Sequence, residues 1–292
     1  MNLQNLNKKL NAYERLMRLD KPIGILLLLW PTLWALWLAS RGMPDWITLL
    51  IFITGTVLMR SAGCVMNDIA DRKYDGLVER TKNRPLATGE VSVKEACLLA
   101  AGLALAAFLL VMQFNKTTIF LSFAALFLAV TYPFTKRFLA IPQAYLGVAF
   151  GFGIPMAFAA VSDTIPPLAW VLLTTNVFWA IAYDTEYAMV DRDDDVKIGI
   201  KSSAILFGKY DVIAVMVCYA IMFVLLAYIG QLMGFGRLYF IGLGSACILA
   251  CRQYVLIKKR LKTDCFKAFL HNNWIGLAIF IGLAIQLKWH NI

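Results

Sequence analysis

Charged residues are scarce in this chain of 292 residues. Asp, Glu, Lys and Arg make up 16% of it, whereas hydrophobic residues make up 60% and the mean hydropathy is +0.68. Soluble domains carry about 25% charged residues and about 45–50% apolar ones. The composition therefore excludes an ordinary soluble protein and predicts an integral membrane protein.

Histidine and cysteine are also too few to carry the chemistry. His271 and His290 are far apart in the sequence, which excludes a histidine metal cluster and a paired nucleophile and base. The six cysteines lie mostly in apolar runs, where a small buried thiol is the default. Cys247 and Cys251 share a helix face, but two soft ligands alone do not make a metal site. Any catalysis must therefore rest on carboxylates and cations.

Apolar runs long enough to cross a bilayer, about 20 residues in a helix, begin at nine places. We therefore predict an all-α, polytopic membrane protein with nine transmembrane helices in a single domain over residues 1–292. Residues 1–21 are polar and mixed in charge, so we expect no cleavable signal peptide. Apolar residues recur there at helical spacing, which predicts a leader helix on the membrane surface. The nine runs begin at Pro22, Trp46, Ala96, Thr118, Leu139, Leu168, Val212, Leu238 and Phe266.

Lys and Arg are concentrated between alternate runs, and cationic loops stay on the cytoplasmic side of a membrane. We therefore expect a cytoplasmic N-terminus, an external C-terminus and, for a bacterial protein, a place in the inner membrane. The anionic inner leaflet then accounts for most of the net charge of +10 without a nucleic-acid partner. Most of the 28 Lys and Arg lie in residues 1–21, 68–94, 134–137, 191–210 and 252–267.

The acidic residues gather in two short windows. More than half of the 18 Asp and Glu lie in residues 68–79 and 184–195, where two spans run into cytoplasmic loops. Both windows are thus on one side of the membrane and can face one cavity. In the first window, Asn67, Asp71 and Asp75 are spaced i, i+4 and i+8, which predicts three oxygen-bearing side chains on one helix face. Asp68 lies close to this row.

The second window repeats this pattern. Asp184 and Asp191 are two helical turns apart, and Asp195 follows one turn later. Two carboxylate rows without Cys or His suit Mg²⁺, which is hard, takes oxygen ligands and usually bridges to a phosphate. A single such cluster is more often a solvated helix end. Two clusters beside the bilayer favour a functional site, because charges there are costly.

A cationic loop follows each acidic row. The first, ERTKNRPLATG, contains Arg80, Lys82 and Arg84, and the second, VKIGIKSSAILFG, contains Lys197 and Lys201. Metal together with Lys and Arg suits a diphosphate, because the cations offset the charge of the leaving group. The positive charge of either loop by itself is explained by membrane topology alone, because cationic loops stay in the cytoplasm. In combination with the acidic rows, the loops indicate a diphosphate site at the membrane boundary.

A third segment, TYPFTKRF, places Tyr132, Lys136 and Arg137 at the end of the fourth run. Its two cations can equally be ordinary positive charges that only set the orientation of the chain in the membrane. As functional groups, Lys136 would reach the diphosphate. Arg137 would pair with an acidic acceptor substrate through a fork-like contact that Lys cannot copy.

The segments NDIADRKYD, YDTEYAMVDRDDDVKIGIKS, TYPFTKR and RLDKPIGILLLLWPTLWALW resemble the UbiA superfamily of intramembrane prenyltransferases, and the resemblance extends over nearly the whole chain. It implies a helical bundle around a central cavity, capped by aspartate-rich loops at residues 68–94 and 191–210 and open sideways to membrane lipid. It also implies Mg²⁺-dependent transfer of a polyprenyl group from polyprenyl diphosphate to 4-hydroxybenzoate, at the ring carbon ortho to the hydroxyl, in ubiquinone biosynthesis.

The resemblance also implies a role for each signature residue. Arg137 would bind the carboxylate of 4-hydroxybenzoate, and Asp191 would also position or deprotonate its phenol. The remaining roles are Asn67, Asp68, Asp71 and Asp75 on one Mg²⁺, Asp191 and Asp195 on a second, and Tyr132, Lys136, Arg72, Lys82 and Lys197 on the diphosphate oxygens.

The same residues also weigh against two other classes of membrane protein. A transferase that uses CDP-alcohols needs Asp-Gly-x-x-Ala-Arg, a pattern that DGLVER breaks at Glu79. A cation-coupled transporter would place its carboxylates near the membrane midplane and not at helix ends. Within the superfamily, homogentisate and dihydroxynaphthoate are alternative acceptors. Isoprenoid chain length, oligomeric state and the roles of Asn272 and Asn273 stay open.

Overall fold

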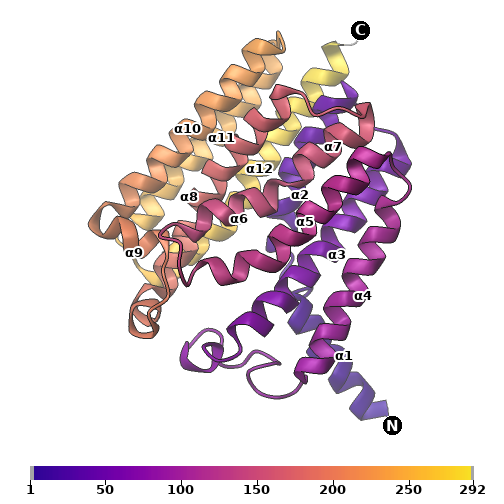
Figure 1. The fold of residues 1–292 in the computed structure, drawn as a ribbon. Coiled ribbons are helices and arrows are strands. Elements are labelled where there is room, and N and C mark those ends of the chain that lie inside the picture. The colour runs from indigo at the N-terminus through magenta and orange to yellow at the C-terminus, as the bar shows by residue number, and fades with distance from the viewer. Residues whose placement is uncertain (1–2, 291–292) are drawn as a thin grey trace.

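The computed structural model describes residues 3–290 as a bundle of long helices (Figure 1), with no strand among these residues. This confirms the predicted all-α class. Residues 1 and 2 of the predicted leader lie outside the described part. The helices are α1 Leu3–Met17, α2 Ile23–Ser40, α3 Trp46–Asp71, η1 Asp75–Leu77, α4 Val93–Val111, α5 Lys116–Thr135, α6 Pro142–Gly151, α7 Gly153–Ser162, α8 Pro167–Ile198, α9 Ser203–Phe207, η2 Gly208–Tyr210, α10 Asp211–Leu232, α11 Arg237–Ile257 and α12 Lys262–His290.

Eight segments of the described chain are long and apolar enough to cross a membrane. They correspond to eight of the nine predicted runs. The remaining run lies in α8, which has 32 residues but carries buried polar groups along its length. One of them, Asn176, donates a hydrogen bond to the Gly147 carbonyl of α6, 2.9 Å away. The eight segments are Ile23–Ser40, Trp46–Asp71, Val93–Val111, Lys116–Thr135, Pro142–Ser162, Ser203–Leu232, Arg237–Ile257 and Lys262–Trp289.

The fifth predicted run is divided into the short helices α6 and α7 at Phe152. Pro155 has no N–H to donate to the carbonyl of Gly151, so the helical ladder is interrupted there. A Cβ on Gly153 would lie 2.6 Å from the Thr32 hydroxyl oxygen. Glycine therefore permits α7 to pack closely on α2.

A buried polar network joins α8, α10 and α12. The Tyr219 hydroxyl lies 2.8 Å from Asn272 Oδ1 and 3.1 Å from Glu186 Oε1, and Asn272 Nδ2 donates to Glu186 at 2.8 Å. Asn273 accepts a hydrogen bond from the Trp30 indole of α2, also at 2.8 Å. The two asparagines whose role the sequence left open thus connect helices to one another.

The leader helix α1 docks on the bundle. Leu16 is buried against Val65 of α3 and Ala96 of α4. Lys9 forms an ion pair with Glu95 at the start of α4, with 2.8 Å between nitrogen and oxygen. The predicted amphipathic helix is therefore present, and its inner face contacts protein.

The two termini lie at opposite ends of the bundle (Figure 1). The end that carries α1 also carries residues 72–92 and 199–210, and we call it the loop end. Lys201 joins residues 199–210 to the α5–α6 connection, because its main-chain N–H donates to the Lys136 carbonyl at 2.9 Å. Helices α3 and α8 both reach the loop end, which brings the two acidic rows together.

Candidate active site

A cavity of about 590 Å³ lies at the loop end, between α2, α3, α5, α6, α8 and α12. Both acidic rows line this one cavity, as their positions in the sequence predicted. Tyr132 of α5 and Lys136, directly after the C-terminal end of that helix, also line the cavity. The acidic-row residues on its wall are Asn67, Asp68, Asp71, Asp75, Asp184, Asp191 and Asp195.

The first row does not stay on one helix face. Helix α3 ends at Asp71, and Asp75 begins the separate 3₁₀ turn η1. The Asp75 carbonyl accepts a hydrogen bond from the Thr81 hydroxyl at 2.8 Å, which folds the loop back on itself. The predicted i, i+4, i+8 helical row is therefore wrong at its third member. Asp75 still reaches the cavity, because the loop turns its side chain inward.

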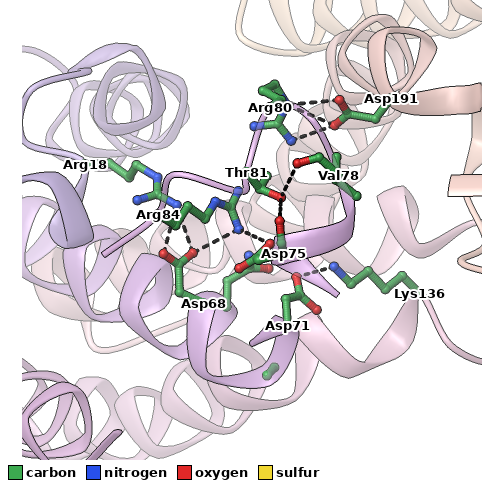
Figure 2. A network of polar contacts seen from close by, with 12 residues as sticks. Arg18, Asp68, Asp71, Asp75, Val78, Arg80, Thr81, Arg84, Lys136 and Asp191 are labelled. Atoms are coloured by element: carbon green, nitrogen blue, oxygen red, sulfur yellow. Dashed lines mark hydrogen bonds and ion pairs between the residues drawn. The ribbon is translucent and has the colours of Figure 1, made fainter. Parts of the chain in front are cut away.

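Arginines hold the outer carboxylates of the first row (Figure 2). Asp68 is completely buried and accepts from Arg18 Nη2 at 2.8 Å, and Arg84 Nη1 lies 3.1 Å from the same oxygen. Arg84 also pairs with Asp75 at 2.8 Å. Arg18 follows α1 in the chain, so the leader contributes a cation to the cavity.

The first row retains unsatisfied oxygen atoms. Lys136 pairs with Asp71 through Oδ2, but Asp71 Oδ1 and Asp75 Oδ2 are buried without a hydrogen-bond partner in the described structure. Burial raises the pKa of Asp75 above its ordinary value, since Arg84 offsets the effect only in part. Buried, unpartnered carboxylate oxygens are a donor set that a hard cation fits.

The described residues contain no preformed cluster of three His, Cys, Asp or Glu side chains around a metal position. The acids of the first row instead contact Arg and Lys. The chemistry of the donors fits Mg²⁺, which would share these carboxylates with the cations.

The second row is held by the first cationic loop. Arg80 donates to Asp191 from Nε at 3.0 Å and from Nη2 at 2.6 Å, a two-pronged contact that joins residues 72–92 to α8 (Figure 2). The Arg80 guanidinium also lies 4.6 Å from the centre of the Tyr187 ring. Burial, together with the charge of Asp191, raises the pKa of Asp195 to about 7.

A cation without a carboxylate partner lies deeper in the cavity. Arg60 of α3 forms no ion pair in the described chain, and its buried Nε has no hydrogen-bond partner. Its guanidinium lies 5.3 Å from the Phe150 ring centre and packs against Gly24, where a Cβ would lie 2.5 Å from Nη2. An unpaired guanidinium inside an apolar bundle is costly and indicates a binding role.

A second, apolar cavity of about 130 Å³ adjoins the first. The two cavities share Arg60, Tyr132 and Phe150 in their walls, so they meet at these residues. Small side chains, among them Gly63 and Ala129, line the apolar cavity between α3 and α5. The site therefore places a charged chamber beside an apolar one.

Three of the predicted diphosphate ligands lie outside the cavity wall. Arg72, Lys82 and Lys197 are exposed. Lys82 pairs with Glu79 at 2.7 Å and Lys197 with Asp194 at 3.4 Å, each within one turn of chain. Solvated local partners of this kind contribute little energy.

Arg137 is also outside the cavity wall. It is exposed, donates to the Ala70 carbonyl at 2.6 Å and lies 5.0 Å from the Phe134 ring centre. The structure thus separates Arg137 from Lys136, its neighbour in the chain. The reason is geometric, since adjacent residues at the end of a helix point in different directions.

Sequence reasoning missed several cavity residues. Arg80 and Arg84 were predicted as cations of a loop at a diphosphate site, but not as partners of the acidic rows, and Arg18 was given no role in the site. Arg60 offered a usable signal, because it is a cation inside an apolar run. Asp184 was placed in the second acidic row by its spacing from Asp191, but it was given no role of its own.

The chain matches the UbiA prenyltransferase family over residues 28–277. It belongs to this family. A relative from Methylobacillus flagellatus, named 4-hydroxybenzoate octaprenyltransferase, is 64% identical over 279 residues, which are 96% of this chain and 94% of the relative. A relative of the same name from Azoarcus sp. is 64% identical over 281 residues, 96% of this chain and 98% of the relative.

Solved structures of the family share the fold. The apo structure of a UbiA homologue from Aeropyrum pernix K1 has a TM-score of 0.79 and 25% identity, covering 90% of this chain and 97% of that one. A UbiA homologue from Archaeoglobus fulgidus, solved bound to GPP and Mg²⁺, has a TM-score of 0.68 and 20% identity, covering 94% and 99%. Family and apolar helices together make this chain a multi-pass membrane prenyltransferase.

Proposed function

We propose that this protein transfers a polyprenyl group from polyprenyl diphosphate to the ring carbon ortho to the hydroxyl of 4-hydroxybenzoate, in ubiquinone biosynthesis. Full-length relatives at 64% identity bear the name of this activity. The single structural observation that carries the proposal is a pair of adjacent cavities, one lined by carboxylates and cations and the other by apolar walls, with the unpaired Arg60 in the wall of both.

The charged chamber suits the diphosphate. Mg²⁺, which the Archaeoglobus fulgidus homologue binds together with GPP, would offset the negative charge of the diphosphate as it leaves. The residues that would hold Mg²⁺ are Asn67, Asp68, Asp71 and Asp75 in the first row and Asp191 and Asp195 in the second.

The cations that now pair with those acids supply the other half of the diphosphate site. Arg18, Arg80, Arg84 and Lys136 line the chamber, and each contacts an acid that a metal would use. With Mg²⁺ held by the carboxylates, these cations would be available to bind the diphosphate oxygens. Arg72, Lys82 and Lys197 would then act only as long-range positive charge, because they lie off the chamber wall.

We assign the acceptor carboxylate to Arg60 in preference to Arg137. Arg60 lines the cavity without an anionic partner, whereas Arg137 is exposed and donates to the Ala70 carbonyl. A fork-shaped guanidinium in a buried position binds a carboxylate strongly. The isoprenoid chain would lie in the apolar cavity, which begins at Tyr132 and Phe150, beside Arg60.

We further propose that the protein lies in the bacterial inner membrane with its loop end in the cytoplasm. The segments rich in Lys and Arg support this orientation through the positive-inside rule. Termini at opposite ends of the bundle agree with it (Figure 1). Both water-soluble components, 4-hydroxybenzoate and diphosphate, would then enter and leave on the cytoplasmic side.

The test uses membranes that contain the protein, geranyl diphosphate, radiolabelled 4-hydroxybenzoate and Mg²⁺, with and without EDTA. We expect a lipid-soluble labelled product that disappears with EDTA and is absent from membranes lacking the protein. Parallel reactions with labelled homogentisate and dihydroxynaphthoate test the acceptor. Product from either of these, but none from 4-hydroxybenzoate, would overturn the assignment.

A further inference from the structure

Asp184 belongs to the second acidic row and lines the cavity, but it has no assigned role on the metal or the diphosphate. It lies on α8 two turns before Asp191, lines the same cavity and forms no ion pair in the described chain. The residue is only partly buried although it lies within the bundle, so its accessible atoms face the cavity. Its place in the fold therefore points to a small ligand.

The neighbours of Asp184 fix its orientation. Gln143 of α6 is buried, and its Oε1 accepts a hydrogen bond from the Ser203 main-chain N–H at 2.9 Å. The amide NH₂ of Gln143 is thereby left to donate to Asp184. The Ser203 hydroxyl is in turn 2.6 Å from the Thr185 hydroxyl of α8. This chain of contacts holds the carboxylate in place without neutralising it.

Asp184 and Arg60 form a matched pair of free groups. They come from α8 and α3, lie close enough to interact electrostatically and yet make no direct ion pair. A ligand with an acid at one end and a hydroxyl at the other satisfies both, through a carboxylate on Arg60 and a hydroxyl on Asp184. Asp191 is less suited to the hydroxyl, because Arg80 already engages both of its oxygens.

We propose that Asp184 is the catalytic base that accepts the phenolic proton of the acceptor, with Gln143 as its positioning residue. This inference rests on the proposed function. A phenol that gives up its proton becomes electron-rich at the ortho carbon, which is the carbon that attacks.

The carbon–oxygen bond of the allylic diphosphate breaks, and the diphosphate leaves with the electron pair. The ortho ring carbon forms the new carbon–carbon bond while the phenolic proton passes to Asp184, giving a neutral dienone. The hydrogen on the attacked ring carbon then leaves as a proton to the diphosphate, and Asp184 returns its proton to the oxygen. The phenol and its aromatic ring are thus restored.

The test is Asp184→Asn, which keeps the size of the side chain and an acceptor for Gln143. General base catalysis contributes about 10²–10⁴-fold, so we expect kcat with 4-hydroxybenzoate to fall by at least about 100-fold. Mg²⁺-dependent cleavage of geranyl diphosphate without acceptor should stay unchanged, as should the KM for geranyl diphosphate. Asp193→Asn is the matched control, because Asp193 is exposed on the same helix and pairs with Lys262.

A second readout separates a base from a structural residue. With 3-fluoro-4-hydroxybenzoate, whose phenol is more acidic, the activity of Asp184→Asn relative to wild type should rise by about tenfold or more. The proposal is overturned by wild-type turnover in the variant, by loss of diphosphate cleavage together with transfer, or by a deficit that the fluorinated acceptor leaves unchanged. Failure of the proposed function itself would show differently, as a wild-type protein that makes no product from 4-hydroxybenzoate.

Discussion

Replacing Arg60 by leucine tests the acceptor site most directly. Arg60 forms no ion pair in the described chain. The substitution therefore removes a buried charge and does not take an ion-pair partner away from any acid. We therefore expect Arg60→Leu protein to fold and to accumulate in membranes. The loss should appear in binding of the acceptor.

The size of that loss follows from the contact. A hydrogen bond to a charged group contributes about 1.5–3 kcal/mol, and every 1.4 kcal/mol is about tenfold in affinity. Arg60→Leu should therefore raise the KM for 4-hydroxybenzoate by about 10–150-fold. The KM for geranyl diphosphate should change little, because the proposed diphosphate site lies among the outer cations. Arg60→Lys should be intermediate, since Lys keeps the charge but loses the fork.

Arg137→Ala is the comparison variant. Its side chain is exposed and donates to a main-chain carbonyl, so its removal should change the KM for 4-hydroxybenzoate by less than about threefold. The assay measures labelled product in membranes at varied acceptor concentration and saturating geranyl diphosphate. A larger effect from Arg137→Ala than from Arg60→Leu, or equal losses for both substrates in Arg60→Leu, would refute the reasoning.

Three further substitutions test the surrounding structure. Asp71→Asn should lower turnover by about 100-fold or more at an unchanged protein level in membranes, and normal product formation would contradict its metal role. Gly24→Ala places a Cβ 2.5 Å from Arg60 Nη2 and should displace this flexible group, raising the KM for 4-hydroxybenzoate by about tenfold without lowering the melting temperature in detergent. Asp211→Asn leaves Arg192 without its buried carboxylate partner. The loss of about 3 kcal/mol of folding free energy should lower that melting temperature by several degrees. An unchanged melting temperature would show that the contact does not stabilise the fold.

Local spacing predicted the second acidic row well and the first only in part. Asp191 and Asp195 lie on one helix, α8, because helical sequence continues through them to Ile198. The spacing of Asp75 is helical too, but the chain leaves the helix after Asp71. A hydrogen bond within the loop, from the Thr81 hydroxyl to the Asp75 carbonyl, supports that turn, and such a contact is invisible to a local pattern.

Two arginines show more clearly what a sequence pattern cannot predict. Arg60 and Arg137 are alike in residue type, and the position of Arg137 beside Lys136 favoured it from the sequence. Only tertiary packing puts the Arg60 guanidinium beside Gly24 and Phe150 in the cavity and leaves Arg137 exposed. Composition and hydropathy predict which segments cross the membrane, but they do not say which of two arginines faces inward.

The contact between Arg80 and Asp191 also has a consequence for biosynthesis. It joins a loop made early in translation to a helix made much later, and the cavity wall needs both. A nascent chain that stops before α8 would carry Arg80 at the membrane surface without this carboxylate and would lack one side of the chamber. We therefore expect enzymatic activity only after most of the bundle has been inserted, so that a truncated chain should be inert and should not release a reactive allylic cation without an acceptor.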